Sequence, residues 1–221
     1  MPLSPRRPLV VIGLLLAVAL AGCGRVPGVY VYESDSGGAP ADGAAATDAK
    51  TYVAEAWASK IVPTVHDKAV DITTVAAAVA EDPDAAGKQY GHQAGTGSPY
   101  AFMVKGAGTV TEVDTSVPTG PMTVEIPQTG KKPLTVAIAT GPVIAGTAVR
   151  DAVGFIAFGD FTNQIEYADV ANQINARVKT DVIAKVDLPA ATGKKVTFHG
   201  AFSALAGGPI LVVPTELEVA S

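Results

Sequence analysis

Residues 121–139, PMTVEIPQTGKKPLTVAIA, decide the fold, because they contain two runs in which apolar and other residues alternate. The first run covers 122–126 and the second covers 134–138, with Gly130-Lys131-Lys132 between them. A period of two is typical of half-buried strands, and a glycine-containing break is typical of a turn. The stretch therefore predicts two neighbouring antiparallel strands of a meander.

Three further strands are expected around this pair. One begins near Tyr100 and is interrupted by Gly106-Ala107-Gly108, which predicts a sharp bend or bulge. Two more follow late in the chain, around 196–202 and 210–219. Pro214 lacks a backbone N–H, so the last strand is expected to lie at a sheet edge or to bend at that residue.

Helices are expected before the strands and between the third and fourth of them. In the first section the expected caps are Thr47 or Asp48, Asp71 and Asp82. Pro63 should end or kink the first of these helices. A short helix is expected over 147–153, and a long one over about 163–186, where valine or isoleucine recurs at every fourth position from 170. Thr162 is a candidate cap for the long helix, and Asp160 and Asn163 are alternatives.

This order predicts a mainly β fold with added α. We expect an OB-like five-stranded antiparallel Greek-key barrel, with an N-terminal helical section and a long helix inserted between the third and fourth strands. An open antiparallel sheet with the long helix across one face is the alternative. The expected organisation is a signal peptide over 1–22, a lipidated N-terminus and flexible tether over 23–46, helices over 47–99 and the barrel with its inserted helices over 100–221.

The first residues have the pattern of an export signal. Arg6 and Arg7 precede an apolar run over 9–21, which is too short to span a bilayer. The run ends in Leu20-Ala21-Gly22-Cys23, which resembles the bacterial lipobox. That resemblance implies lipidation of the Cys23 thiol, and fatty acyl chains there would anchor the protein to the membrane outside the cytoplasm. An ordinary signal peptide, or an uncleaved anchor with an incidental cysteine, is the alternative.

Composition narrows the classes of function. Removal of the two signal arginines takes the formal charge from −5 to −7, so a nucleic acid is a poor partner. Cys23 is the single cysteine, and its use as an anchor leaves no thiol for catalysis or for metal binding. Gly, Ala, Ser, Pro and Asp dominate 34–43, which is the composition of a linker.

The densest group of polar residues lies between the third strand and the long helix. Its members are Thr147, Arg150, Asp151, Asp160, Thr162, Asn163, Gln164 and Glu166. Such groups can bind sugar hydroxyls or a polar peptide, but they can equally form a buried network that docks the inserted helices. Arg150 and Asp151 diverge by about 100° on a helix and are not expected to pair. Arg150 would instead reach Asp160 or Glu166.

Other motifs predict no cofactor and no metal. His66, His92 and His199 are far apart and share no helical spacing, and the chain has no H-E-x-x-H motif. The glycines over 141–147 lack the Lys-Ser/Thr of a P-loop, and G-x-S-x-G is absent. These histidines are therefore expected to be ordinary surface or core residues.

Three segments resemble a known bacterial family. They are Tyr52–Pro63 (YVAEAWASKIVP), Phe102–Asp114 (FMVKGAGTVTEVD) and Gly141–Ala168 (GPVIAGTAVRDAVGFIAFGDFTNQIEYA). The family is that of predicted periplasmic lipoproteins, domain of unknown function 2291. The resemblance implies a lipid-anchored exported protein with an OB-like fold, often encoded beside ribose-type sugar ABC transporters. It supplies no catalytic residues, and the long Gly/Ala/Asp-rich tether departs from the family pattern.

Three functions are compatible with these features. The first is a non-enzymatic binding or accessory lipoprotein that works with a sugar ABC importer by contacting the solute-binding protein, the permease or the sugar. The second is a sugar-processing enzyme, a mutarotase or hydrolase, with Asp160 and Glu166 as an acid–base pair. The third is a structural envelope lipoprotein that binds another protein through an edge strand.

Overall fold

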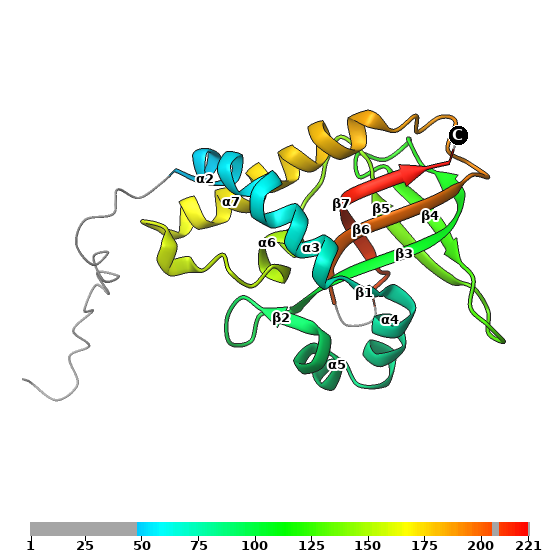
Figure 1. The fold of residues 1–221 in the computed structure, drawn as a ribbon, viewed down its shortest axis with the longest axis horizontal. Helices are drawn as coiled ribbons and strands as arrows, with labels where there is room; N and C mark the ends of the chain where they lie inside the picture. The colour runs from blue at the N-terminus through cyan, green and yellow to red at the C-terminus, as the bar shows by residue number, and fades with distance from the viewer. Residues whose placement is uncertain (1–47, 205–207, 221) are drawn as a thin grey trace, which may run out of the picture. The chain divides into compact units, whose positions relative to one another are not determined.

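The structure, a computed structural model, describes residues 48–204 and 208–220 (Figure 1). The predicted signal peptide 1–22, the lipidation site Cys23 and the tether 23–46 lie outside the described residues. Within the described residues, no helix combines the length and the apolar character that a membrane crossing needs.

The first helical segment runs through Pro63 and does not end there. Helix α2 (Ala49–Ala56) continues as a π-helical turn, η1 (Trp57–Ile61), and then as α3 (Val62–Lys68). Asp48 caps α2 by accepting a hydrogen bond from the Thr51 amide at 3.0 Å, as predicted. The Val62 amide bonds to the Trp57 carbonyl, five residues back. This wider turn lies where the Pro63 ring would crowd an ordinary α-helical turn, so the helix continues.

Two shorter helices follow, and their predicted caps are confirmed. Asp71 caps α4 (Ile72–Glu81), and Asp82 caps α5 (Pro83–Tyr90). The section 47–99 is not purely helical, however. The short strands β1 (Val70–Asp71) and β2 (Gly91–Gln93) both pair with the first long strand.

Five long strands form the rest of the seven-stranded sheet. They are β3 (Tyr100–Val113), β4 (Pro121–Ile126), β5 (Leu134–Ala139), β6 (Lys195–Ser203) and β7 (Leu211–Val219). Their pairings run from β3 through β4, β5, β7 and β6 and return to β3, so they close in a ring. The prediction of a wholly antiparallel sheet was wrong, because β5 and β7 are parallel, as are β1 and β3.

The glycines of β3 allow close approach and do not break the strand. A β-carbon on Gly106 would lie 2.8 Å from Phe198 Cζ, and one on Gly108 would lie 2.5 Å from the Glu125 carbonyl oxygen. The pairing register of β3 with β4 shifts later, between Val110 and Glu112, and not at the glycines. The glycines therefore admit a side chain from one neighbouring strand and the backbone of another.

Pro214 lies in a strand that has partners on both sides. β7 pairs with β6 along most of its length and with β5 at Leu211 and Val212, so it is not an edge strand as a whole, although the register partner of Pro214 is on β6 alone. The alternative prediction of an irregularity is confirmed, because the β6–β7 register shifts beside His199 and Gly200, which is opposite Pro214. The missing N–H of proline is tolerated at that break in the ladder.

The inserted helices lie between β5 and β6 in the chain. They are α6 (Ala148–Ala152), η2 (Phe158–Asp160), α7 (Gln164–Arg177), η3 (Val178–Val182) and η4 (Ile183–Lys185). The long helix is thus α-helical, then π-helical, then 3-10. Its apolar face is buried, with Val170, Ile174 and Val178 at most 1% exposed. α2 packs beside α7 (Figure 1).

Candidate functional site

Arg150 and Asp151 of α6 form an ion pair, so the expectation that they do not pair was wrong. Arg150 Nη2 lies 2.7 Å from Asp151 Oδ1, and Arg150 Nε donates to the same oxygen at 2.8 Å. The two side chains are only 9% and 11% exposed. Although their Cβ atoms diverge on the helix, the long arginine side chain folds back to its neighbour. Burial favours this, since a buried charge needs a partner.

This pair also joins α6 to α7. Arg150 Nη1 donates to the Tyr167 carbonyl oxygen at 3.1 Å, and the guanidinium lies 3.9 Å from the centre of the Tyr167 ring. Thr147 Oγ1 donates to Asp151 Oδ2 at 2.5 Å. Burial is the largest cause of the raised pKa of the Tyr167 phenol. The arrangement neutralises both charges and fixes the short helix against the long one.

The other predicted polar residues form turns and helix caps. Asp160 accepts from the Ala157 amide at 2.9 Å, and Glu166 accepts from the Thr162 amide at 3.1 Å. Asn163, and not Thr162, caps α7, by accepting from the amides of the second and third residues of the helix. Gln164 is the exposed first residue of α7. Among the described residues no hydrogen bond or ion pair joins Arg150 to Asp160 or Glu166, so that prediction was wrong.

Asn175 belongs to the same region and was not predicted. Its side-chain amide is buried and donates to the carbonyl oxygens of Ile144 and Gly146, at 3.3 and 3.0 Å. It thereby holds the loop before α6 against α7. In the part of the chain that the structure describes, every buried side-chain nitrogen and oxygen has a hydrogen-bond partner. This region has the contacts of a docking network.

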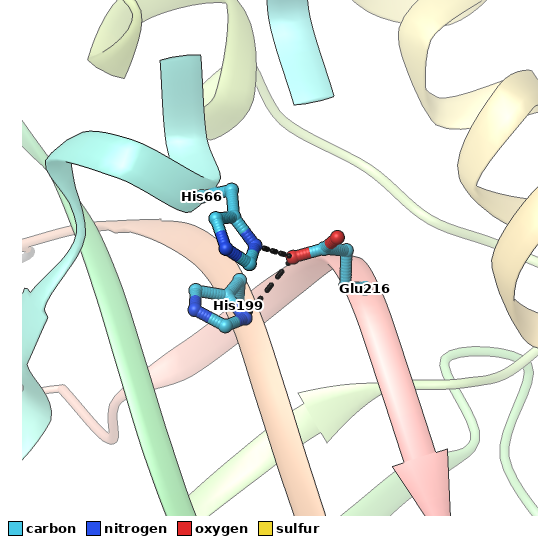
Figure 2. A group of neighbouring side chains, drawn as sticks. All are labelled: His66, His199 and Glu216. Carbon is cyan, nitrogen blue, oxygen red and sulfur yellow. Dashed lines mark hydrogen bonds and ion pairs between the residues drawn. The ribbon is translucent and has the colours of Figure 1, made fainter. Parts of the chain in front are cut away.

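A second cluster brings together two histidines that are far apart in the sequence and were expected to be ordinary surface or core residues. Figure 2 shows His66, His199 and Glu216 converging from α3, β6 and β7. His66 Nδ1 lies 2.8 Å and His199 Nδ1 lies 3.1 Å from Glu216 Oε2. The two imidazole rings are stacked, with centroids 4.5 Å apart and planes 25° apart. His92 lies on β2 and does not belong to this cluster.

The two histidines differ in their environments. The His66 side chain is 56% exposed, and its hydrogen bond to Glu216 is the largest cause of its raised pKa. The His199 side chain is 24% exposed, and burial is the largest cause of its lowered pKa. Glu216 therefore stabilises the protonated form of one ring, while burial favours the neutral form of the other.

The sequence held little that could have revealed this cluster. His199 and Glu216 are register partners on β6 and β7, so a correct pairing of these strands would have placed them together. The register shift beside His199 hides that pairing from simple counting. His66 reaches the pair only because α3 packs on β6, which no local pattern indicates.

The ring of strands with helices packed on it defines the class as an OB-like fold. A crystal structure of an OB-fold protein from Thermotoga maritima MSB8 is similar, with a TM-score of 0.65 and 22% sequence identity. The match covers 79% of this chain and 99% of that one. No curated protein matches the chain.

The chain belongs to the family of predicted periplasmic lipoproteins, DUF2291, whose profile matches residues 14–218. That match includes Cys23 and nearly all of the described residues. The protein is thus a lipid-anchored protein of the cell envelope, outside the cytoplasm. The family assignment and localisation inferred from the sequence are confirmed.

Proposed function

We propose that this lipoprotein is a non-enzymatic accessory component of a sugar ABC importer, anchored through a lipid on Cys23 and acting by contact with a membrane-bound component. We also infer that the ring of five strands is a Greek-key barrel that serves as a rigid scaffold. The closed order of pairings supports this inference. Family membership supports the location, and the predicted genomic association supports the choice of importer.

The observation that carries the proposal is that the two candidate acid–base carboxylates, Asp160 and Glu166, are already hydrogen-bonded to the backbone. Asp160 and Glu166 each accept a backbone amide beside α7, and Arg150 is neutralised by Asp151. A general acid or base must reach a substrate proton, whereas these groups stabilise a turn and the helix start. The region is therefore better suited to holding a surface in shape than to proton transfer.

Apolar side chains are exposed near the start of α7, where a partner protein can contact them. We call residues 158–165 the α7 entry; within it, Phe158 is 54% and Ile165 is 81% exposed. Tyr52, in the first turn of α2, packs edge-on against Phe161 at 5.2 Å between ring centroids. The first described helix after the tether therefore starts beside the α7 entry. Large exposed apolar residues of this kind favour protein contact.

A site-specific crosslinking experiment tests the proposal. A photoreactive residue is placed at Ile165 of the full-length lipoprotein, and the matched control carries it at Lys131 in the β4–β5 turn. We expect the Ile165 probe to capture an importer component in intact cells and the Lys131 probe not to. Deletion of the protein should lower sugar uptake. Equal labelling from both positions together with unchanged uptake would contradict the proposal.

A further inference from the structure

The side chains of His66, His199 and Glu216 meet although they come from three separate elements. His199 and Glu216 are held on adjacent strands in fixed register, and His66 lies in the last turn of α3. Their donor atoms all lie within 4.8 Å of one another. Rigid strands supply two of the three ligands, which is the preorganisation that a binding site needs.

We propose that these three side chains form a binding site for a divalent transition metal of the zinc class. The ligands would be Nδ1 of His66, Nδ1 of His199 and a carboxylate oxygen of Glu216. Two imidazole nitrogens and one carboxylate oxygen suit Zn²⁺ and its neighbours, whereas Mg²⁺ and Ca²⁺ prefer oxygen ligands alone.

The geometry requires little movement to accept such an ion. Both imidazole Nδ1 atoms already face one carboxylate oxygen, at 2.8 and 3.1 Å (Figure 2). Ligand bonds of about 2.0–2.2 Å in a tetrahedron place donor atoms about 3.3–3.6 Å apart. Each nitrogen would therefore separate from the carboxylate oxygen by about half an ångström, within the reach of a glutamate rotamer. Each neutral ring would carry its proton on Nε2 and leave Nδ1 free for the metal.

The site is open to solvent on one side. The side chains of His66, His199 and Glu216 are 56%, 24% and 36% exposed. Glu216 also lines a hollow of about 530 Å³ that is bordered by Trp57 and Lys185. Three protein ligands and open access leave coordination positions for water or for a group from a partner, as in metal sites that remain reactive or exchangeable.

The surrounding charges favour a cation. Asp67 and Glu218 act on the two histidines together with Glu216, while Lys105 acts in the opposite sense. Lys105 is the register partner of His199 on β3. Around the two rings, the carboxylates that act on them thus outnumber the one ammonium group.

Metal titration of the full-length lipoprotein in detergent micelles tests the site. The protein carries an affinity tag without histidine, is stripped with a chelator, and competes with a fluorescent chelator for Zn²⁺ near pH 7.5. We expect one equivalent to bind, and His66→Ala or Glu216→Gln to weaken binding by about a hundredfold. The matched control is His92→Ala, which should bind like the wild type.

A second measurement uses only the wild-type protein, so its outcome does not depend on whether a variant folds. Co²⁺ added to the wild-type protein should broaden the ring NMR signals of His66 and His199 at one equivalent and leave His92 sharp. The proposal is overturned if no stoichiometric zinc binds, if His92→Ala weakens binding as much as His66→Ala, or if Co²⁺ affects all three histidines alike. The cluster would then be an ion pair that ties α3 to the sheet.

Discussion

The Arg150–Asp151 network and the His66–His199–Glu216 cluster both hold separate elements together through charged side chains, but they differ in exposure. The first pair is about one-tenth exposed, and its remaining groups bond to Thr147 and to the Tyr167 carbonyl. In the second cluster His66 is more than half exposed, and both histidines share one carboxylate oxygen. The first has its partners inside the protein, and the second presents its ligand atoms near the surface.

This difference separates charged groups that stabilise the fold from charged groups that can bind a ligand or exchange protons with solvent. A buried pair contributes little over apolar residues of the same shape, yet removal of one partner leaves an uncompensated charge. An exposed group loses its partner at small cost, because water replaces it. Substitutions in the two regions should therefore have different main effects. At the Arg150–Asp151 network they should lower stability, and at the His66–His199–Glu216 cluster they should change the titration of the histidines.

The largest expected effect is at Arg150. Replacement by alanine should lower the free energy of unfolding by about 3–5 kcal/mol, because Asp151 is then buried without its partner. The matched control is Arg177→Ala, which removes a partly exposed pair with Asp181 at 3.4 Å. That variant should lose less than about 1 kcal/mol. Urea denaturation measures both, and equal losses would contradict the distinction between the two regions.

An intermediate effect is expected at the start of α7. Asn163→Ala removes the side-chain oxygen that accepts two helix amides, and should cost about 1 kcal/mol. Thr162→Ala is the control, because only the backbone amide of Thr162 contributes a described bond there. Thermal unfolding compares the two variants. A larger loss for Thr162→Ala would show that the cap has been misassigned.

The smallest expected effect is on the pKa values of His66 and His199 in the metal-free protein. His66 should keep its proton to a pH above the ordinary value of 6.5, because it is hydrogen-bonded to Glu216. His199 should lose its proton below that value, because burial opposes the charge. NMR of the ring protons measures both pKa values. Glu216→Gln should lower the pKa of His66, and a titration in the reverse order would contradict the assignment.

The pKa shifts of His66 and His199 make the stability of the protein depend on pH in opposite directions. Because the pKa of His66 is raised on folding, its contribution is fully present below pH 6.5 and is lost as pH rises through the folded-state pKa. Because the pKa of His199 is lowered, its contribution is present above pH 6.5 and is lost as pH falls through its folded-state pKa. Lys105 lowers both pKa values, while Asp67 raises that of His66 and Glu218 raises that of His199.

Most local elements could be predicted from the sequence, because their signals are local. Asp71 and Asp82 cap helices in the structure as predicted, and the alternation over 122–126 and 134–138 marks two strands. The path through Pro63 could not be predicted, since proline normally ends or kinks a helix and only the π turn before it permits continuation.

The contacts within the two regions were harder to predict than the elements. Spacing on an ideal helix separated Arg150 from Asp151, but burial and a flexible guanidinium brought them together. His66 and His199 came together through packing between α3 and β6, which depends on the whole fold. The sequence places polar residues on elements, while tertiary packing decides which of them meet.

The pairing of β3 with β6 also bears on how the protein reaches this structure. Thr109 and Lys195 are partners across these strands although they are 86 residues apart. Contacts of such long sequence separation form slowly, because closing a long loop costs entropy before the contact forms. When the chain is released from its amino end, β3 cannot pair with β6 until the last quarter of the chain has followed. Aggregation competes with productive folding during that interval.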